Sequence, residues 1–283
     1  MILIDMPHFT PQRIDAATYH AIDAVSSSWL KRVDAEGWAV ARYDTRARTD
    51  SRALVIGSAV HAVIEGTFAE LYRAAPAEYR TANSAKFDAF TGECEAAGQT
   101  ALTLDEFEMA KHCGEAILAK IGPWSVGKRQ YIEGSLTWTE PTEYGPVSCK
   151  CRPDILQVWS PTSIRYYEIK TSRGNGLRQW KRDVWTYGYW LQESHYEAGL
   201  RAHGIEQVQT IFLVVRKDSP HIVRAYETDP LDKAVAARRW RELIEEYARR
   251  EAQNDWDDDS IMSPTRVELG MRQPDDLEEV ESE

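Results

Sequence analysis

Residues 150–172, KCRPDILQVWSPTSIRYYEIKTS, decide the fold of this chain. From Val147 to Leu156 the side chains alternate in character, as in a β-strand with one buried face. A Ser-Pro-Thr-Ser turn follows at residues 160–163, and the return run from Ile164 to Thr171 is rich in β-branched and aromatic residues. We therefore predict two adjacent strands joined by a short turn.

Three charged side chains converge if these strands pair. Asp154 lies on the first strand, on the same face as Lys150 and Arg152. Glu168 and Lys170 are two residues apart and share a face of the second strand. Two carboxylates suit Mg²⁺, which completes its shell with water and phosphate oxygens. A lysine beside them can orient or deprotonate an attacking water and offset charge on a phosphate.

A surface hairpin with one ion pair is the commoner fate of a single Glu-x-Lys. Three features favour a site instead. Pro153, which cannot donate to a strand ladder, precedes Asp154; the Glu-x-Lys lies in an otherwise apolar strand; and two cations flank Asp154 on its own face.

The pair Pro153-Asp154 and Glu168-Ile169-Lys170 resembles the core motif of the PD-(D/E)xK nucleases. With three further motifs in the same order, the chain resembles the RecE-type exonuclease VIII group and, more distantly, lambda exonuclease. The resemblance spans about Tyr19 to Arg250 and implies a restriction-endonuclease-like core, a central mixed β-sheet flanked by helices. The order of predicted elements gives the same α/β class.

A helix predicted over residues 51–73 carries His61 and Glu65, which share a face because they are four residues apart. A neutral imidazole there can bind a metal while the glutamate orients it or binds through water, although a lone helical histidine is more often structural. The segment GSAVHAVIEGT, residues 57–67, resembles the family's Gly-x-x-x-His-x-x-x-Glu segment. The resemblance implies two Mg²⁺ or Mn²⁺ ions held by a set of four residues. These are His61, Asp154, Glu168 and, through its carbonyl, Ile169.

Three serines, Ser26 to Ser28, precede Trp29 and predict a helix start, where hydroxyls cap free amides and a phosphate can also bind. Capping alone explains such serines. YHAIDAVSSSWL, residues 19–30, resembles the family's N-terminal segment, which implies that Ser28 helps to hold a DNA 5′-phosphate.

A long helix is predicted from about Leu177 to His203. Its start is basic, and cations there could bind a phosphate backbone without sequence preference. The predicted DNA-binding cations are Arg152, Arg173, Arg178, Lys181 and Arg182. Later in the helix, Gln192-x-x-x-Tyr196 resembles the family's Gln-x-x-x-Tyr motif and implies that both residues line the active site; aromatics at this spacing are otherwise core residues.

Further elements complete the expected domain. Residues 127–139 are predicted to form one strand. Glu133 on this strand could add an acidic group to the site, but we expect it to be a solvated strand residue. Two strands follow the long helix, at residues 208–216 and 221–227, and a helix covers residues 231–250 after Asp229-Pro230.

The net charge of −11 is concentrated at one end. Residues 251–283 hold twelve Asp and Glu against Arg266 and Arg272, a net of −10, which leaves −1 for residues 1–250. A nearly neutral body can hold a basic groove, whereas the acidic end is typical of a disordered, solubilising tail. We therefore divide the chain into an N-terminal lead (1–18), an exonuclease domain (19–250) and an acidic tail (251–283).

The cysteines do not suit zinc or disulfides, since none has paired CxxC spacing. No signal peptide or membrane span is visible, so a reduced, cytoplasmic protein is expected. Related iron-sulfur nucleases carry three cysteines after the Gln-x-x-x-Tyr helix. Here no cysteine follows Cys151, so we expect no iron-sulfur cluster.

These observations predict a metal-dependent DNA exonuclease. The resemblance implies action on duplex ends from 5′ to 3′ in phage or prophage-type recombination or repair, with a single-strand annealing protein as partner and a ring-shaped trimer or tetramer. A structure-specific or restriction-like endonuclease of the same fold is the alternative. A non-catalytic DNA-end-binding module is more distant, because all three charged residues of the core motif are present.

Overall fold

The computed structural model describes residues 9–44, 51–79, 82, 84–126 and 128–257. Its centre is a mixed five-stranded sheet in the order β10-β9-β8-β7-β4. The strands are β4 (Gln130–Ile132), β7 (Ile155–Ser160), β8 (Ser163–Ser172), β9 (Gln207–Arg216) and β10 (Val223–Tyr226). β8 and β9 are parallel, and the other neighbours are antiparallel. The expected mixed α/β architecture is confirmed.

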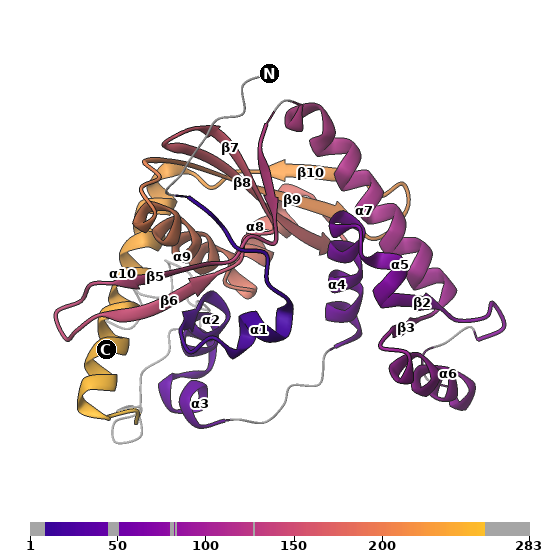
Figure 1. The fold of residues 1–283 in the computed structure, drawn as a ribbon, viewed down its shortest axis with the longest axis horizontal. Helices are drawn as coiled ribbons and strands as arrows, with labels where there is room; N and C mark the ends of the chain where they lie inside the picture. Colours follow the sequence, from indigo (N-terminus) through magenta and orange to yellow (C-terminus); the bar gives the residue numbers. More distant parts are fainter. Residues whose placement is uncertain (1–8, 45–50, 80–81, 83, 127, 258–283) are drawn as a thin grey trace, which may run out of the picture.

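Helices cover both faces of this sheet (Figure 1). Alternation along β8 turns Tyr167 and Ile169 toward α4 (Arg52–Glu65) and α7 (Leu104–Ser125). The other face of β8 carries Tyr166, which packs in one core with α9 (Tyr189–Ala202) and α10 (Pro230–Gln253). Glu168 and Lys170 therefore share the α9 side of β8.

A second sheet has the order β1-β6-β5, with β1 (Val25–Ser26), β6 (Val147–Cys151) and β5 (Leu136–Glu140). The single strand predicted over residues 147–156 is thus wrong, because Arg152-Pro153-Asp154 separates β6 from β7 and the two strands join different sheets. The strand predicted over residues 127–139 is divided in the same way. It breaks at Glu133, whose φ of 52° lies in the left-handed region.

Two predicted helices are shorter than expected. The helix over residues 51–73 ends as α4 at Glu65, where Gly66 adopts a left-handed φ of 79°. α5 (Phe68–Leu71) and β2 (Tyr72–Ala74) follow it. The helix over residues 177–203 breaks at Gly188, φ 61°, into α8 (Leu177–Thr186) and α9.

Other predicted elements are confirmed. α2 (Ser27–Glu36) begins at the serine run, where the Ser26 hydroxyl accepts a hydrogen bond from the Trp29 N–H at 3.3 Å. Asp229 caps α10 in the same manner, through the Leu231 N–H at 2.9 Å. The remaining elements are α1 (Ala16–Ala21), α3 (Trp38–Tyr43), α6 (Ala85–Ala96) and β3 (Thr100–Leu102), which pairs with β2.

The packed structure extends beyond the boundaries predicted at residues 19 and 250. Phe9 is 1% exposed, and Gln12 bridges to Ser135. At the other end α10 continues to Gln253, and Trp256 is buried beside Trp29. Residues 258–283, most of the predicted acidic tail, lie outside the described residues.

All four cysteines are buried and free. Within the part of the chain that the structure describes, no helix combines the length and the apolar character that crossing a bilayer requires.

Candidate active site

An open cavity of about 2290 Å³ brings the predicted motifs together. Its walls come from α2, α4, β8, α9 and the loop that precedes β7. The residues that line it and that matter most for chemistry are Ser28, Lys31, His61, Glu133, Asp154, Lys170, Gln192 and Tyr196.

Three ligand-type side chains meet at one wall. Nδ1 of His61 lies 3.4 Å from Oδ1 of Asp154 and 3.6 Å from Oε1 of Glu133. The candidate ligand atoms of these three residues all lie within 4.8 Å of one another. The second oxygen of Asp154 is fixed by the backbone N–H of Ile169 at 2.6 Å, so the carboxylate holds its orientation while Oδ1 faces the cluster.

Glu133 is the unexpected member of this group. Its left-handed backbone ends β4, and its N–H donates to the Asp154 carbonyl at 2.9 Å, which places the two side chains beside each other. The expectation of a solvated Glu133 is wrong, since its side chain is only 14% exposed. Nε of Arg152 pairs with Oε2 of Glu133 at 2.9 Å, so this arginine is held inside the cluster.

Glu168 is fully buried and meets the site through two residues that line the cavity, Lys170 and Gln192. Its Oε2 accepts hydrogen bonds from Nζ of Lys170 at 3.0 Å and from Nε2 of Gln192 at 2.7 Å. Its Oε1 is buried and has no hydrogen-bond partner among the described residues. Such an orphaned carboxylate oxygen is costly in a folded protein, and a divalent cation with oxygen ligands would satisfy it.

The pKa shifts at the site reflect carboxylates buried close to an imidazole. Burial raises the pKa of Asp154, and burial together with Asp154 raises the pKa of Glu168 to about 7. Burial lowers the pKa of His61, but Asp154 and Glu133 outweigh it and raise the pKa to about 9. Without a metal, the carboxylates therefore draw protons to the site. The donor set of imidazole nitrogen and carboxylate oxygens fits a divalent ion that would displace those protons.

A match to a protein-family model shows which family the chain belongs to. Residues 26–260 match the model of a PDDEXK-like domain of unknown function (DUF3799). The chain belongs to this family. Comparison with curated proteins gave no match.

Solved structures give the same fold. A protein from Eubacterium rectale, which carries the name "Putative exonuclease", is 15% identical to this PDDEXK-like domain; the match covers 96% of this chain and 99% of that one, with a TM-score of 0.55. SSO0001 is 16% identical over 68% of this chain and 86% of that one, and its TM-score of 0.29 is too low for an argument.

Several predicted residues have different surroundings from those expected. Glu65 was predicted to orient His61, but it lines the cavity and pairs with Arg13 at 3.7 Å. Lys150 was placed on the face of Asp154, yet it is buried, and its Nζ donates to the carbonyls of Tyr19, His20 and Ile22 at 3.0, 3.2 and 2.6 Å. It lines the cavity, but its ammonium group is used to hold the C-terminal end of α1 against β6.

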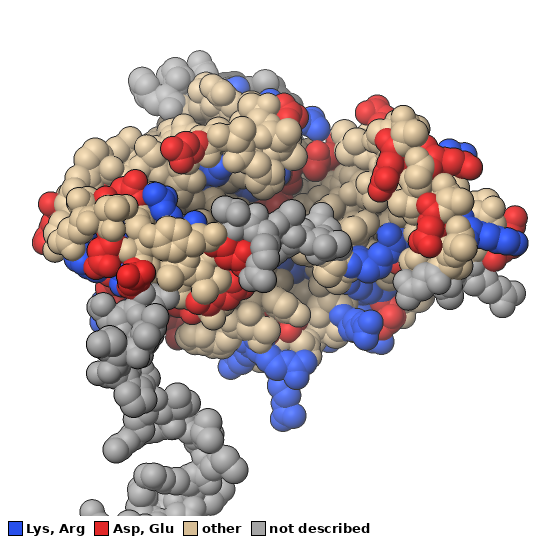
Figure 2. Space-filling model, turned by 90° about the horizontal axis from the view of Figure 1, so that it is seen from below, with Lys and Arg blue, Asp and Glu red and all other residues tan. Residues whose placement is uncertain are grey.

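The other predicted DNA contacts lie at the rim. Ser28 is exposed and lines the cavity, as do Arg173 and Arg182. Arg178 and Lys181 are exposed on α8 but are not among the lining residues. Figure 2 shows one face of the molecule with a hollow between two flanks and lysine and arginine side chains beside it.

Lys31 is a residue of the site that the sequence reasoning missed. Its Nζ donates to Oε1 of Gln192 at 3.2 Å, which links α2 through Gln192 to Glu168. Burial, followed by the charge of Lys170, lowers the pKa of Lys31 to about 8. The signal was present, because Lys31 follows Ser28 by three residues and so shares its side of α2.

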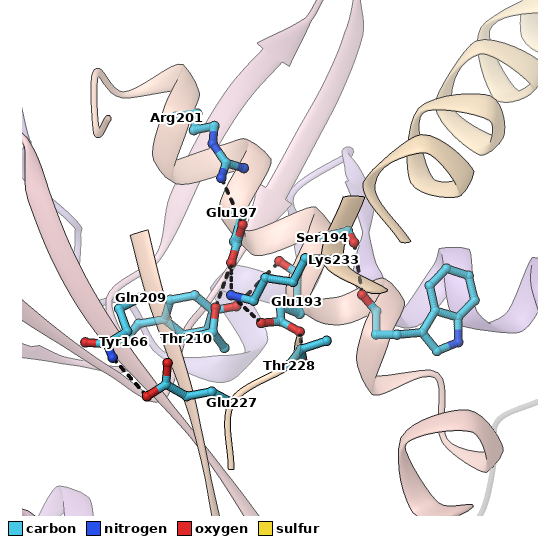
Figure 3. Close-up of polar contacts among 11 residues, drawn as sticks. Tyr166, Glu193, Ser194, Glu197, Arg201, Gln209, Thr210, Glu227, Thr228 and Lys233 are labelled. Atoms are coloured by element: carbon cyan, nitrogen blue, oxygen red, sulfur yellow. Dashed lines mark hydrogen bonds and ion pairs between the residues drawn. The ribbon is translucent and has the colours of Figure 1, made fainter. Parts of the chain in front are cut away.

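A buried polar network holds α9 in place (Figure 3). Nζ of Lys233 lies 2.8 Å from Oε1 of both Glu193 and Glu197. Thr210 donates to Glu197 at 2.9 Å and Thr228 to Glu193 at 2.6 Å. These bonds tie α9 to β9, to the loop after β10 and to α10, so the helix that carries Gln192 and Tyr196 has a fixed position over Glu168.

Proposed function

We propose that this chain is a metal-dependent exodeoxyribonuclease that hydrolyses phosphodiester bonds from the ends of duplex DNA. One observation carries the proposal. The buried Oε1 of Glu168 has no hydrogen-bond partner among the described residues, while its Oε2 accepts from Lys170, which lines the same cavity as Asp154 and His61. The family match, the resemblance to exonucleases in the sequence motifs and the shared fold of the Eubacterium rectale protein support it.

Asp154 and Glu168 would hold Mg²⁺ or Mn²⁺ together with His61, Glu133 and the carbonyl of Ile169. When bound, one or two such ions stabilise charge on the attacking and leaving oxygens of an in-line displacement. Glu133 is an additional proposed ligand, beyond the set implied by the motifs. Its position next to His61 and Asp154 supports this addition.

Lys170 would position the attacking water and offset charge on the scissile phosphate. Burial lowers its pKa, but Glu168 and Asp154 outweigh this and raise the pKa above its ordinary value. In the metal-free protein Lys170 is therefore charged, which supports an electrostatic and orienting role. Gln192 fixes the oxygen of Glu168 that the lysine shares, and Tyr196 closes the wall behind it.

The test is digestion of linear duplex DNA labelled at either the 5′ or the 3′ end, with and without Mg²⁺. We expect Mg²⁺-dependent loss of the 5′ label first and no cutting of closed circular DNA. Cleavage of the circular form would favour the endonuclease alternative. Asp154→Ala and Lys170→Ala should both abolish cleavage while the circular dichroism spectrum is unchanged, and retained Mg²⁺-dependent cleavage in either variant would refute the assignment.

The role in recombination or repair, the annealing-protein partner and a trimeric or tetrameric ring are further proposals that rest on the resemblance. Size-exclusion chromatography with light scattering, at several protein concentrations, tests the ring. Co-purification with a single-strand annealing protein encoded beside this chain tests the partner.

A further inference from the structure

The outer face of α8 combines cations with an exposed aromatic ring. Arg178, Lys181, Arg182 and Trp185 follow one another at helical spacings of three, one and three residues, so they share one face, and all four are exposed. Trp185 is 74% exposed. The opposite side of the helix is packed, because Trp180 and Asp183 are buried there.

A second exposed ring, that of Tyr187, lies directly after α8 at the cavity. Tyr187 is 56% exposed and lines the cavity. Its ring centre lies 5.6 Å from that of Tyr189, and Nζ of Lys170 lies 4.9 Å from the Tyr189 ring. The left-handed Gly188 between the two tyrosines makes the turn from α8 into α9. Aromatic rings therefore lead from the proposed catalytic lysine through Tyr189 to Tyr187, directly after the end of α8.

Single exposed apolar residues are common on protein surfaces and need no function. Here two large exposed rings and three exposed cations lie on α8 or directly after it, and two of these five residues, Arg182 and Tyr187, line the cavity of the proposed active site. Cations contact phosphates whatever the sequence, and exposed aromatic rings stack on bases only where the bases are unpaired. In duplex DNA the base faces are stacked on one another and inaccessible. A duplex would therefore contact the cations but would not stack on the aromatic rings.

We propose that the outer face of α8, formed by Arg178, Lys181, Arg182 and Trp185, together with Tyr187, binds a single-stranded DNA segment that enters the cavity, with bases stacked on Trp185 and Tyr187. The inference rests on the proposed nuclease function and deepens it. It assigns an unpaired end as the form of DNA that reaches Lys170. Wild-type protein is then expected to degrade a duplex with a short single-stranded overhang faster than a blunt duplex.

Binding without metal tests the proposal apart from catalysis. The probe is a fluorescent oligonucleotide of about ten thymidines, compared with the same strand that carries abasic sites at its centre. Wild-type protein should bind the abasic strand roughly tenfold more weakly, since stacking contributes that order of affinity per base. Trp185→Ala should lose roughly tenfold on the normal strand and then show a smaller further loss on the abasic strand, because of the two proposed stacking residues only Tyr187 is left.

Three further variants separate stacking from other roles. Trp185→Phe keeps an aromatic ring and should retain most of the affinity for the normal strand. It should also retain most of the abasic penalty, which is the loss of affinity caused by the abasic sites. Arg182→Ala should weaken both strands equally and reduce the salt dependence of binding. Leu231→Ala, at another exposed apolar position (78% exposed), should bind as the wild type does.

An abasic penalty that persists unchanged in Trp185→Ala would overturn the proposal. So would conversion of an oligomer to a monomer by Trp185→Ala in light scattering with unchanged DNA affinity, since the face would then join two copies of the chain. Failure of the nuclease function is a separate outcome. It would appear as absence of Mg²⁺-dependent cleavage by the wild type, whereas the stacking inference is decided by the metal-free binding data.

Discussion

The backbone N–H of Ile169 donates a hydrogen bond of 2.6 Å to Oδ2 of Asp154. This bond joins the start of β7 to the middle of β8 and fixes one oxygen of the carboxylate. The other oxygen, Oδ1, faces Nδ1 of His61 at 3.4 Å. One side chain thus has two separable roles, a structural one through its acceptor and a proposed metal-binding one through its charge.

Asp154→Asn separates these roles. The amide oxygen can still accept from Ile169, but the negative charge is lost. We expect Mg²⁺-dependent cleavage to fall by about 10²–10³-fold, the usual effect of removing one electrostatic contribution to a transition state. The melting temperature of the metal-free protein should not fall, because burial raises the pKa of Asp154 and a neutral amide costs less to bury.

The control for this variant is Asp218→Asn. Asp218 also lines the cavity, but its side chain is 62% exposed and it pairs with Arg216 at the rim. The Asp218→Asn variant should cleave DNA at the wild-type rate. Activity of Asp154→Asn within a few-fold of wild type would show that the charge of Asp154 is not required.

Stabilisation by Mg²⁺ should depend on pH through Glu168. Its pKa in the metal-free protein is raised from 4.5 to about 7, chiefly by burial. The folded state therefore holds this proton more tightly than the unfolded state does, and the resulting stability is full below about pH 4.5 and is lost as the pH rises through about 7. Because a cation competes with the proton, the rise in melting temperature caused by Mg²⁺ should grow between about pH 6 and pH 8.

Glu168→Gln provides the comparison. Its Mg²⁺-induced rise in melting temperature should be small and nearly independent of pH, as measured by differential scanning fluorimetry over the same pH range. An equal, pH-dependent rise in this variant would place the cation away from Glu168.

Local patterns predicted the centre of the site. A period of two residues placed Glu168 and Lys170 on one face of β8, and the structure joins them at 3.0 Å. The turn at residues 160–163 paired β7 with β8 as expected. The serine run and Asp229 marked helix starts correctly, because capping is decided within four residues.

Such local patterns could not predict interactions between residues that are far apart in sequence. Lys150 obeys the strand alternation, yet carbonyls about 130 residues earlier satisfy its ammonium group. Pro153 is the sequence feature that indicates the break between β6 and β7. It was interpreted only as part of the site motif and not as the end of a strand. Glu133 lies beside His61 and Asp154 because its backbone turns left-handed, and a non-glycine residue gives little sign of this in sequence.

Lys233→Met should destabilise the protein without touching the cavity. Lys233 is the cation shared by Glu193 and Glu197, whose side chains are 3% and 8% exposed. Removal of one partner from a buried pair leaves uncompensated charge, so we expect a loss of roughly 3 kcal/mol in the free energy of unfolding by urea titration. Arg201→Ala is the matched control. Arg201 pairs with the same Glu197 but is 53% exposed, and its removal should cost less than about 1 kcal/mol. Equal effects of the two substitutions would contradict the anchoring role of Lys233.

His195 should make the protein sensitive to mild acid. Its ring is fully buried; Nδ1 accepts from the Trp240 indole N–H at 3.0 Å, so the proton lies on Nε2, which donates to the carbonyl of Lys150 at 3.0 Å. Burial lowers the pKa of His195 from 6.5 to about 4. The folded state therefore binds this proton less readily than the unfolded state, and the stability that neutral His195 contributes is full above about pH 6.5 and is lost as the pH falls toward about 4.

The expected loss from this residue between about pH 7 and pH 5 is roughly 2 kcal/mol, measured as the difference between urea unfolding free energies. His195→Gln cannot titrate, and its amide N–H₂ can still donate to the Lys150 carbonyl. This variant should be less stable than the wild type near pH 7, because the Trp240 contact is disturbed, but should lose less stability on acidification. If wild type and His195→Gln lose stability equally between these pH values, acid sensitivity arises from other groups, and His195 is already able to accept a proton in the folded state.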